Sequence, residues 1–202
     1  MRAVAFGGFD EALVLTELAV PVPAALNAVD AVSPSVGETV LVSGATGGVG
    51  AFAVQFAASR GARVIATAEP GAGAAFVTAL GAAHVVGRED LVEGVREVAP
   101  GGVDAAVHLA GDGAVVSGLV VDGGRFASAV RFVPDDAAAR GVRAVAIVSD
   151  PSPETLRRLA DDVVAGRLRV RIARRCALAE AVEAIGDFVS GTLGKFSVSV
   201  AG

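Results

Sequence analysis

One glycine-rich segment constrains this chain of 202 residues more than any other feature: residues 44–50, which read GATGGVG. It follows an apolar run at 39–43 and precedes a stretch with a helical apolar period at 48–60. In a strand–turn–helix unit, glycines at this spacing allow a tight turn, a close backbone approach to phosphate, and close helix packing. Backbone N–H groups at the start of the helix attract phosphate charge. The segment therefore predicts a dinucleotide-binding unit.

The rest of the chain alternates between short β-branched runs and longer helical stretches. The apolar runs predict strands at 39–43, 62–67, 84–86, 103–109, 124–130 and 142–148. Helices are expected at 48–60, 73–80, 90–98 and 153–165. Such alternation is typical of an α/β fold with a parallel sheet covered on both faces. We expect a doubly wound, Rossmann-type sheet in a single domain spanning residues 1–202.

The two ends of the chain depart from this alternation. Residues 1–23 suggest two short strands around a turn at 7–10, and residues 196–200 alternate like another strand. A two-stranded hairpin alone is marginally stable. We expect these pieces to pair as a small antiparallel β appendage, a cap formed by residues 1–33 and 190–202.

Composition excludes several classes of function. The formal net charge of -5 and the absence of Trp and Tyr argue against a nucleic-acid surface. The single Cys176 and the isolated His84 and His108 lack the spacing of a metal site. Because no apolar stretch approaches about twenty residues, we expect no membrane association and a cytoplasmic location.

The end of the second predicted strand governs the choice of nucleotide. Glu69 lies about twenty residues beyond the glycine segment, where a carboxylate binds the ribose hydroxyls. Glu69 capping the following helix is an equal alternative. No Lys or Arg follows before Arg88, which disfavours a strong site for the extra phosphate of NADP. The choice between NAD and NADP stays open.

Several segments share one pattern: VSGATGGVG at 42–50, AVQFA at 53–57, GARVIATA at 61–68, LGAAHVV at 80–86, GGR at 123–125, LAEA at 178–181 and GKF at 194–196. Together they resemble the zinc-independent medium-chain dehydrogenase/reductases, which include quinone oxidoreductases and the enoyl reductases of polyketide synthases. The opening of the chain, with PVP at 21–23, also resembles the first two strands of that family.

The resemblance implies which residues would hold NAD(P)(H). Gly44 to Val49 would hold the pyrophosphate, Glu69 the ribose, and Ala110 with Gly111 would lie near the nicotinamide. The full set of expected cofactor-binding residues is Ser43, Gly44, Thr46, Gly47, Gly48, Val49, Thr67, Glu69, Ala110, Gly111 and Ser128.

The chain also departs from that family. A GroES-like catalytic domain separates the family's opening strands from its nucleotide loop, whereas only about twenty residues (21–40) stand here. The proposed cap at 1–33 and 190–202 would be its remnant. Asn27 and Asp30 resemble the family's Asn-x-x-Asp segment near the active site, or are ordinary helix or turn residues.

The strongest single candidate for chemistry is His108, at the end of the fourth predicted strand. It could donate a proton near the cofactor, or it could be a packed core residue. Cys176 has basic neighbours but no nearby histidine, so we interpret it as an ordinary thiol. We find no independent catalytic constellation in the sequence.

These observations support three hypotheses. The first is a shortened, NAD(P)(H)-binding quinone or enoyl reductase that acts on a small hydrophobic substrate without a metal. The second is a non-redox cyclase or isomerase that uses an open cleft for a polyketide-like substrate. The third is a binding subunit without catalysis. For any of them, the edge strand near 142–148 predicts a homodimer.

Overall fold

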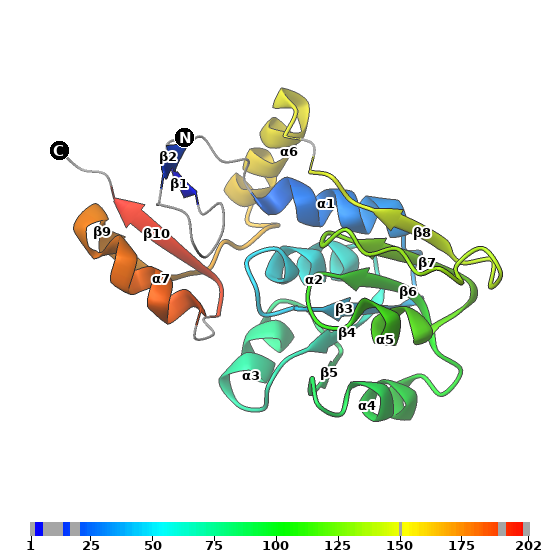
Figure 1. Ribbon diagram of the computed structural model, residues 1–202. Helices are drawn as coiled ribbons and strands as arrows, with labels where there is room; N and C mark the ends of the chain where they lie inside the picture. The colour runs from blue at the N-terminus through cyan, green and yellow to red at the C-terminus, as the bar shows by residue number, and fades with distance from the viewer. Residues whose placement is uncertain (1–2, 6–13, 17–20, 150, 190–192, 200–202) are drawn as a thin grey trace.

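A six-stranded parallel sheet forms the centre of the molecule (Figure 1). The structure is a computed structural model and describes residues 3–5, 14–16, 21–149, 151–189 and 193–199. The strand order is β5-β4-β3-β6-β7-β8, and every pair of neighbours is parallel. The strands are β3 (Thr39–Ser43), β4 (Arg63–Thr67), β5 (His84–Val86), β6 (Val103–His108), β7 (Val120–Ser128) and β8 (Arg143–Ala146).

Helices cover both faces of this sheet. Alternate residues of β3 separate the two cores: Val40 and Val42 pack with one set of helices, whereas Leu41 packs with the other. The first face carries α1 (Pro21–Val32), α2 (Gly50–Ser59), α3 (Ala72–Ala79) and α6 (Pro153–Val164). The second carries α4 (Leu91–Val98) and α5 (Gly113–Gly118). This two-sided burial confirms the doubly wound α/β fold.

The chain order places a topological switch between β3 and β6. From β3 the chain proceeds outward through β4 and β5, and it then returns to β6 and proceeds through β7 to β8. Ligands of doubly wound sheets bind at such a switch, outside the carboxyl ends of the strands. The glycine segment 44–50 follows β3 at this point, as the sequence predicts.

Residues 21–32 correct the expectation of a β cap over 1–33. They form the helix α1, which packs against α2 and against β6 and β7. Pro21 and Pro23 occupy the first turn of a helix, where proline is well tolerated. The buried residues recur with a helical period and provide a signal for α1 that the strand interpretation overlooked: Val22, Ala25, Leu26, Val29 and Val32.

The predicted appendage is also paired differently. β1 (Ala3–Ala5) and β2 (Val14–Thr16) form a short antiparallel pair, whereas the predicted turn at 7–10 lies outside the described residues. The last strand, β10 (Lys195–Ser199), pairs with β9 (Ile172–Ala177), and this pair is parallel. Between them lie a single 3-10 turn, η1 (Leu178–Glu180), and the helix α7 (Ala181–Val189). The small sheet is therefore a parallel β–α–β unit.

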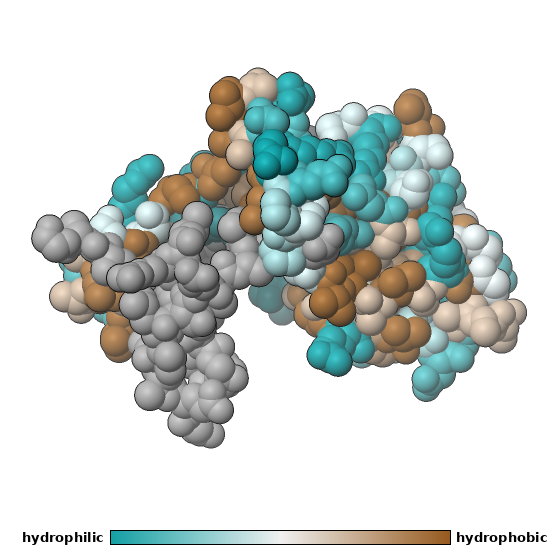
Figure 2. Space-filling view, turned by 90° about the horizontal axis from the view of Figure 1, so that it is seen from above, coloured by the Kyte–Doolittle hydropathy of each residue, from teal (hydrophilic) through white to brown (hydrophobic). Residues whose placement is uncertain are grey.

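Exposed apolar side chains are scattered over several elements. Val148, Val164 and Val182 are the most exposed of those outside the loop at 33–38. On the face seen in Figure 2, hydrophobic and hydrophilic residues are interspersed over the coloured part of the surface. Within the part of the chain that the structure describes, no helix has the length and apolar character to cross a bilayer.

Candidate functional site

The loop between β3 and α2 needs glycine at both of its ends. Gly44 has a φ of 72°, and a Cβ there would lie 2.9 Å from the Cβ of Ala110. A Cβ on Gly50 would lie 2.1 Å from the carbonyl oxygen of Gly44, far inside van der Waals contact. A side chain at either position would therefore displace the loop backbone or the end of β6.

The loop presents backbone donors without acceptors. The Gly47 N–H donates to the Gly44 carbonyl at 3.1 Å, which closes the turn. Among the described residues, the N–H groups of Thr46, Gly48 and Val49 donate no hydrogen bond, and no side chain caps α2. Unsatisfied donors at the start of a helix, together with the helix dipole, attract an anion. The loop is thus suited to a phosphate group.

Thr67 and Ser43, two of the residues predicted to bind the cofactor, form hydrogen bonds that stabilise the loop and the adjacent strand ends. The Thr67 hydroxyl accepts a hydrogen bond from the Gly44 N–H at 2.8 Å, and the Ser43 hydroxyl accepts one from the Leu109 N–H at 3.3 Å. Both side chains are buried. Their hydroxyls therefore fix the ends of β3, β4 and β6 relative to the loop, and they do not face an incoming ligand.

The predicted ribose-binding position carries an ion pair. Glu69 follows β4 and is exposed, and its carboxylate accepts a hydrogen bond from Arg88 Nε at 3.0 Å. Arg88 follows β5, the neighbour of β4 in the sheet. Both groups are largely solvated, so this pair contributes little to stability. It places a carboxylate and a guanidinium together where the ribose of a dinucleotide would lie.

His108 lies in the core beside α5 and not in an open cleft. Its side chain is only 1% exposed and contacts the rings of Phe126 and Phe132. Because a carbonyl only accepts, Nε2 must carry the proton that it donates to the Gly111 carbonyl at 3.1 Å. Nδ1 then accepts from the Ser128 hydroxyl at 3.2 Å. This corrects the expectation of a catalytic His108, since both ring nitrogens are occupied internally.

Ser128 is likewise part of the core. It is fully buried, and its hydroxyl oxygen accepts hydrogen bonds from the N–H groups of Val130 and Phe132. It therefore positions the turn after β7 and makes no direct contact with solvent. Ala110 and Gly111, by contrast, are exposed after the carboxyl end of β6, and Ala110 lies beside Gly44 of the loop.

Asn27 and Asp30 both belong to the helix α1. Asp30 forms an ion pair with Arg60, which directly follows the carboxyl end of α2. The phosphate loop is at the other end of that 10-residue helix, about 15 Å away. Asn27 lies in the middle of α1, one turn before Asp30. The short Asn-x-x-Asp match therefore lies within a helix, and its Asp30 is directed to the end of α2 that is far from the loop.

The described residues do not fit a zinc ion. No three or more His, Cys, Asp or Glu side chains among them are grouped closely enough to hold a metal. The Cys176 thiol is buried and directed to the Ser197 carbonyl at 3.8 Å. His108 has no free nitrogen.

Two residues of the candidate site, Arg88 and Lys195, were not predicted from the sequence. Arg88 is 19 positions from Glu69, and only the adjacency of β4 and β5 brings them together. Lys195 begins β10, and its ammonium lies beside Gly48. The GKF segment at 194–196 did mark this region as a family match, although it gave no indication of what the lysine contacts.

Comparison with known proteins identifies the class to which this fold and loop belong. A family model described as "Zinc-binding dehydrogenase" matches residues 80–195, more than half of the chain. The chain therefore belongs to the medium-chain dehydrogenase/reductase family.

Individual relatives agree with this assignment. The "Putative quinone oxidoreductase YhfP" of Bacillus subtilis (strain 168) is 30% identical over 176 residues, which cover 80% of this chain and 53% of that protein. The chain thus spans about half the length of this curated relative. A quinone oxidoreductase from Coxiella burnetii superposes with a TM-score of 0.78 at 28% identity, covering 91% of this chain and 59% of that one. A mycobacterial protein complexed with NADPH gives 0.75 at 25% identity, covering 89% and 62%.

Proposed function

We propose that this protein binds NAD(P)(H) through the loop at 44–50 and transfers hydride to a small hydrophobic acceptor, a quinone or an enone. One observation carries the proposal: the loop leaves three backbone donors free at the start of α2, in a conformation that only glycine at positions 44 and 50 allows. Such a cradle is suited to the pyrophosphate of a dinucleotide. The quinone oxidoreductases among the relatives support the type of acceptor.

NADP(H) is the cofactor that we favour. The mycobacterial neighbour was solved with NADPH, and Arg88 gives the ribose-binding position a positive charge that could accept a 2′-phosphate. Glu69 opposes this choice, because its carboxylate would repel the extra phosphate. The nicotinamide, when bound, supplies the hydride, and the exposed Ala110 and Gly111 leave its approach open.

In this proposal the described residues orient the cofactor and do not donate the proton that reduction of the acceptor requires. Because His108 is committed to the core, we propose that water supplies the proton that a reduced quinone or enone requires. Reduction of a quinone to a hydroquinone takes one hydride from the cofactor and one proton beyond it, so solvent suffices.

The test is a fluorescence titration of the purified chain with NADPH and NADH, followed by an assay with a small quinone. We expect saturable binding in the micromolar to millimolar range that is common for cofactors. The matched variants are Gly50→Ala, whose Cβ would strike the Gly44 carbonyl, and Gly118→Ala, whose Cβ would meet open space. Gly50→Ala should lose binding and Gly118→Ala should retain it.

The same experiment separates the other hypotheses. Absence of binding at millimolar NADPH and NADH would overturn the proposal. Binding without quinone or enone reduction would leave a cyclase, an isomerase or a binding subunit. If Gly50→Ala does not fold, the wild type's saturable binding and its competition by ADP-ribose still decide the question, because ADP-ribose carries the same pyrophosphate.

A further inference from the structure

The segment that begins β10 is hydrogen-bonded to the phosphate loop. The Gly194 N–H donates to the Thr46 carbonyl at 3.3 Å, and the Lys195 N–H donates to the Arg171 carbonyl at 3.1 Å. Gly194 has a φ of 92°, and a Cβ there would lie 2.9 Å from the Arg171 carbonyl oxygen. The backbone of this segment therefore comes close to the loop and to the segment before β9, which fixes where the Lys195 side chain begins.

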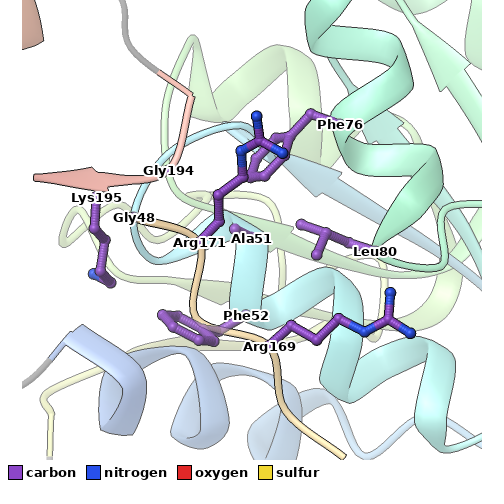
Figure 3. Close-up of a pocket in the computed structure, with 9 residues that line it drawn as sticks. All are labelled: Gly48, Ala51, Phe52, Phe76, Leu80, Arg169, Arg171, Gly194 and Lys195. Carbon is purple, nitrogen blue, oxygen red and sulfur yellow. The ribbon is translucent and has the colours of Figure 1, made fainter. Parts of the chain in front are cut away.

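The ammonium of Lys195 lies directly against the loop. A Cβ built on Gly48 would be 2.9 Å from its Nζ, and Nζ is 5.4 Å from the centre of the Phe52 ring in the first turn of α2. In Figure 3 the side chain extends past Gly48 toward Phe52, whereas Arg171 points the other way, over Phe76. Within the described residues, no carboxylate forms an ion pair with Lys195.

A partly buried ammonium such as that of Lys195 is destabilising when no anion lies close to it. Burial lowers the pKa of the Lys195 ammonium below its usual value of 10.5, and the Phe52 ring is its only described partner. The hollow beside it, lined by Gly48, Phe52 and Arg171 among others, has a volume of only about 10 Å³. That space holds at most a single water, so the hollow is not itself a ligand site. The Lys195 ammonium is therefore partly buried beside the loop with no anionic partner among the described residues.

We propose that Lys195 is a cofactor-binding residue whose ammonium pairs with the pyrophosphate held by the loop. This inference rests on the proposed function, since it requires a dinucleotide at residues 44–50. The free N–H groups of Gly48 and Val49 and the Lys195 ammonium would then share one diphosphate, with neutral donors from the loop and a positive charge from β10. Four rotatable bonds let the ammonium follow the phosphate.

The assignment also gives the β9–β10 unit a role in binding. Lys195 and Gly194 connect that small sheet to the loop, and Arg171 connects it to α3 through the ring of Phe76 at 5.4 Å. A bound pyrophosphate would add a charged contact between the two parts. We therefore expect the cofactor to stabilise the β9–β10 unit along with the main sheet.

The sequence offers a sharp test, because Lys195 is the only lysine of the chain. An amine-acylating reagent can modify it and the terminal amine alone, and peptide mass spectrometry distinguishes the two. We expect saturating NADPH, NADH or ADP-ribose to slow acylation of Lys195 about 10-fold without protecting the terminal amine. Unchanged acylation of Lys195 under conditions where the cofactor demonstrably binds would overturn the inference and leave the proposed function intact.

Variants give the second measurement. Lys195→Met should weaken NADH and NADPH about 10- to 100-fold and equally, because both share the pyrophosphate and a charge-assisted hydrogen bond has this strength. Lys195→Arg should bind within a few-fold of wild type. Arg171→Met is the matched control, because it removes a neighbouring cation that lies over the Phe76 ring of α3. This variant should change the affinity for either nucleotide little. A loss confined to NADPH would assign Lys195 to the 2′-phosphate and overturn the pyrophosphate contact, and an absence of binding by wild type would reject the proposed function itself.

Discussion

The Ser128 hydroxyl and Nδ1 of the buried His108 form a hydrogen bond at 3.2 Å, and Nε2 of the same ring donates to the Gly111 carbonyl at 3.1 Å. The same hydroxyl oxygen receives two backbone N–H groups from the turn after β7. The end of β6, the end of β7 and the following turns are therefore joined by one satisfied network. Such a network specifies the shape of the strand ends at which the nicotinamide would lie.

This network predicts that His108 contributes to stability more than to binding. His108→Leu would leave the Ser128 hydroxyl and the Gly111 carbonyl without partners, at a cost of about 2–3 kcal/mol. Urea unfolding monitored by circular dichroism measures this change. The affinity for NADPH should stay within about threefold of wild type, as befits a side chain outside the site. Unchanged stability with a large loss of quinone reduction would instead make His108 a proton donor.

Sequence periodicity was sufficient for the central sheet because its strands are buried on both faces. Runs such as residues 39–43 and 103–109 are mostly apolar and rich in valine, which is typical of parallel strands between helix layers. The position of the phosphate loop then follows from the chain order, since β3 is the first strand of the sheet.

Other features depend on contacts that no local pattern encodes. The interpretation of α1 as β structure came from Pro21 and Pro23, which end a strand and begin a helix equally well. The parallel pairing of β10 with β9 depends on which strand lies nearby in space. His108 occupies an apolar strand whether it faces a cleft or a core, and only the positions of Phe126 and Phe132 decide between the two.

The Glu69–Arg88 pair predicts how nucleotide preference can be altered. Glu69→Gln removes a negative charge beside the ribose and frees Arg88, so the affinity ratio should shift toward NADPH about 5- to 10-fold. Arg88→Leu should shift it toward NADH. Glu89→Gln, which removes an exposed carboxylate next to Arg88 in sequence, is the control. Fluorescence titrations with both nucleotides give the ratio directly, and equal changes for both would separate this pair from the 2′ position.

The environment of Lys195 predicts a pH dependence of stability. Since the pKa of the folded state is lowered below 10.5, the folded protein binds fewer protons than the unfolded chain as pH approaches 10.5 from below. The desolvation penalty is present in full below the lowered pKa and is relieved as pH rises toward 10.5. Wild type should therefore gain stability relative to Lys195→Met as pH rises toward 10.5.

Saturating NADPH should diminish that gain, because a bound pyrophosphate offsets the desolvation of the ammonium. Chemical denaturation at a series of pH values, with and without NADPH, measures both effects. Arg171→Met provides the comparison, since an arginine stays charged throughout this range. A flat difference between wild type and Lys195→Met would mean that the ammonium is as well solvated in the folded state as in the unfolded chain.

The edge strand β8 predicts how two copies of the chain would associate. β8 pairs only with β7, so its outer edge carries backbone groups without a strand partner among the described residues. Val145 is 37% exposed on this strand and Val148, just beyond it, is 85% exposed. We propose that two β8 strands pair about a twofold axis and continue the sheet across a homodimer.

Val148→Lys would then place two charges at the junction of the two β8 strands and weaken the dimer. Val36→Lys, equally exposed at 85% on a distant loop, would not. Light scattering coupled to size-exclusion chromatography distinguishes these outcomes, and a monomeric wild type at micromolar concentration would contradict the pairing.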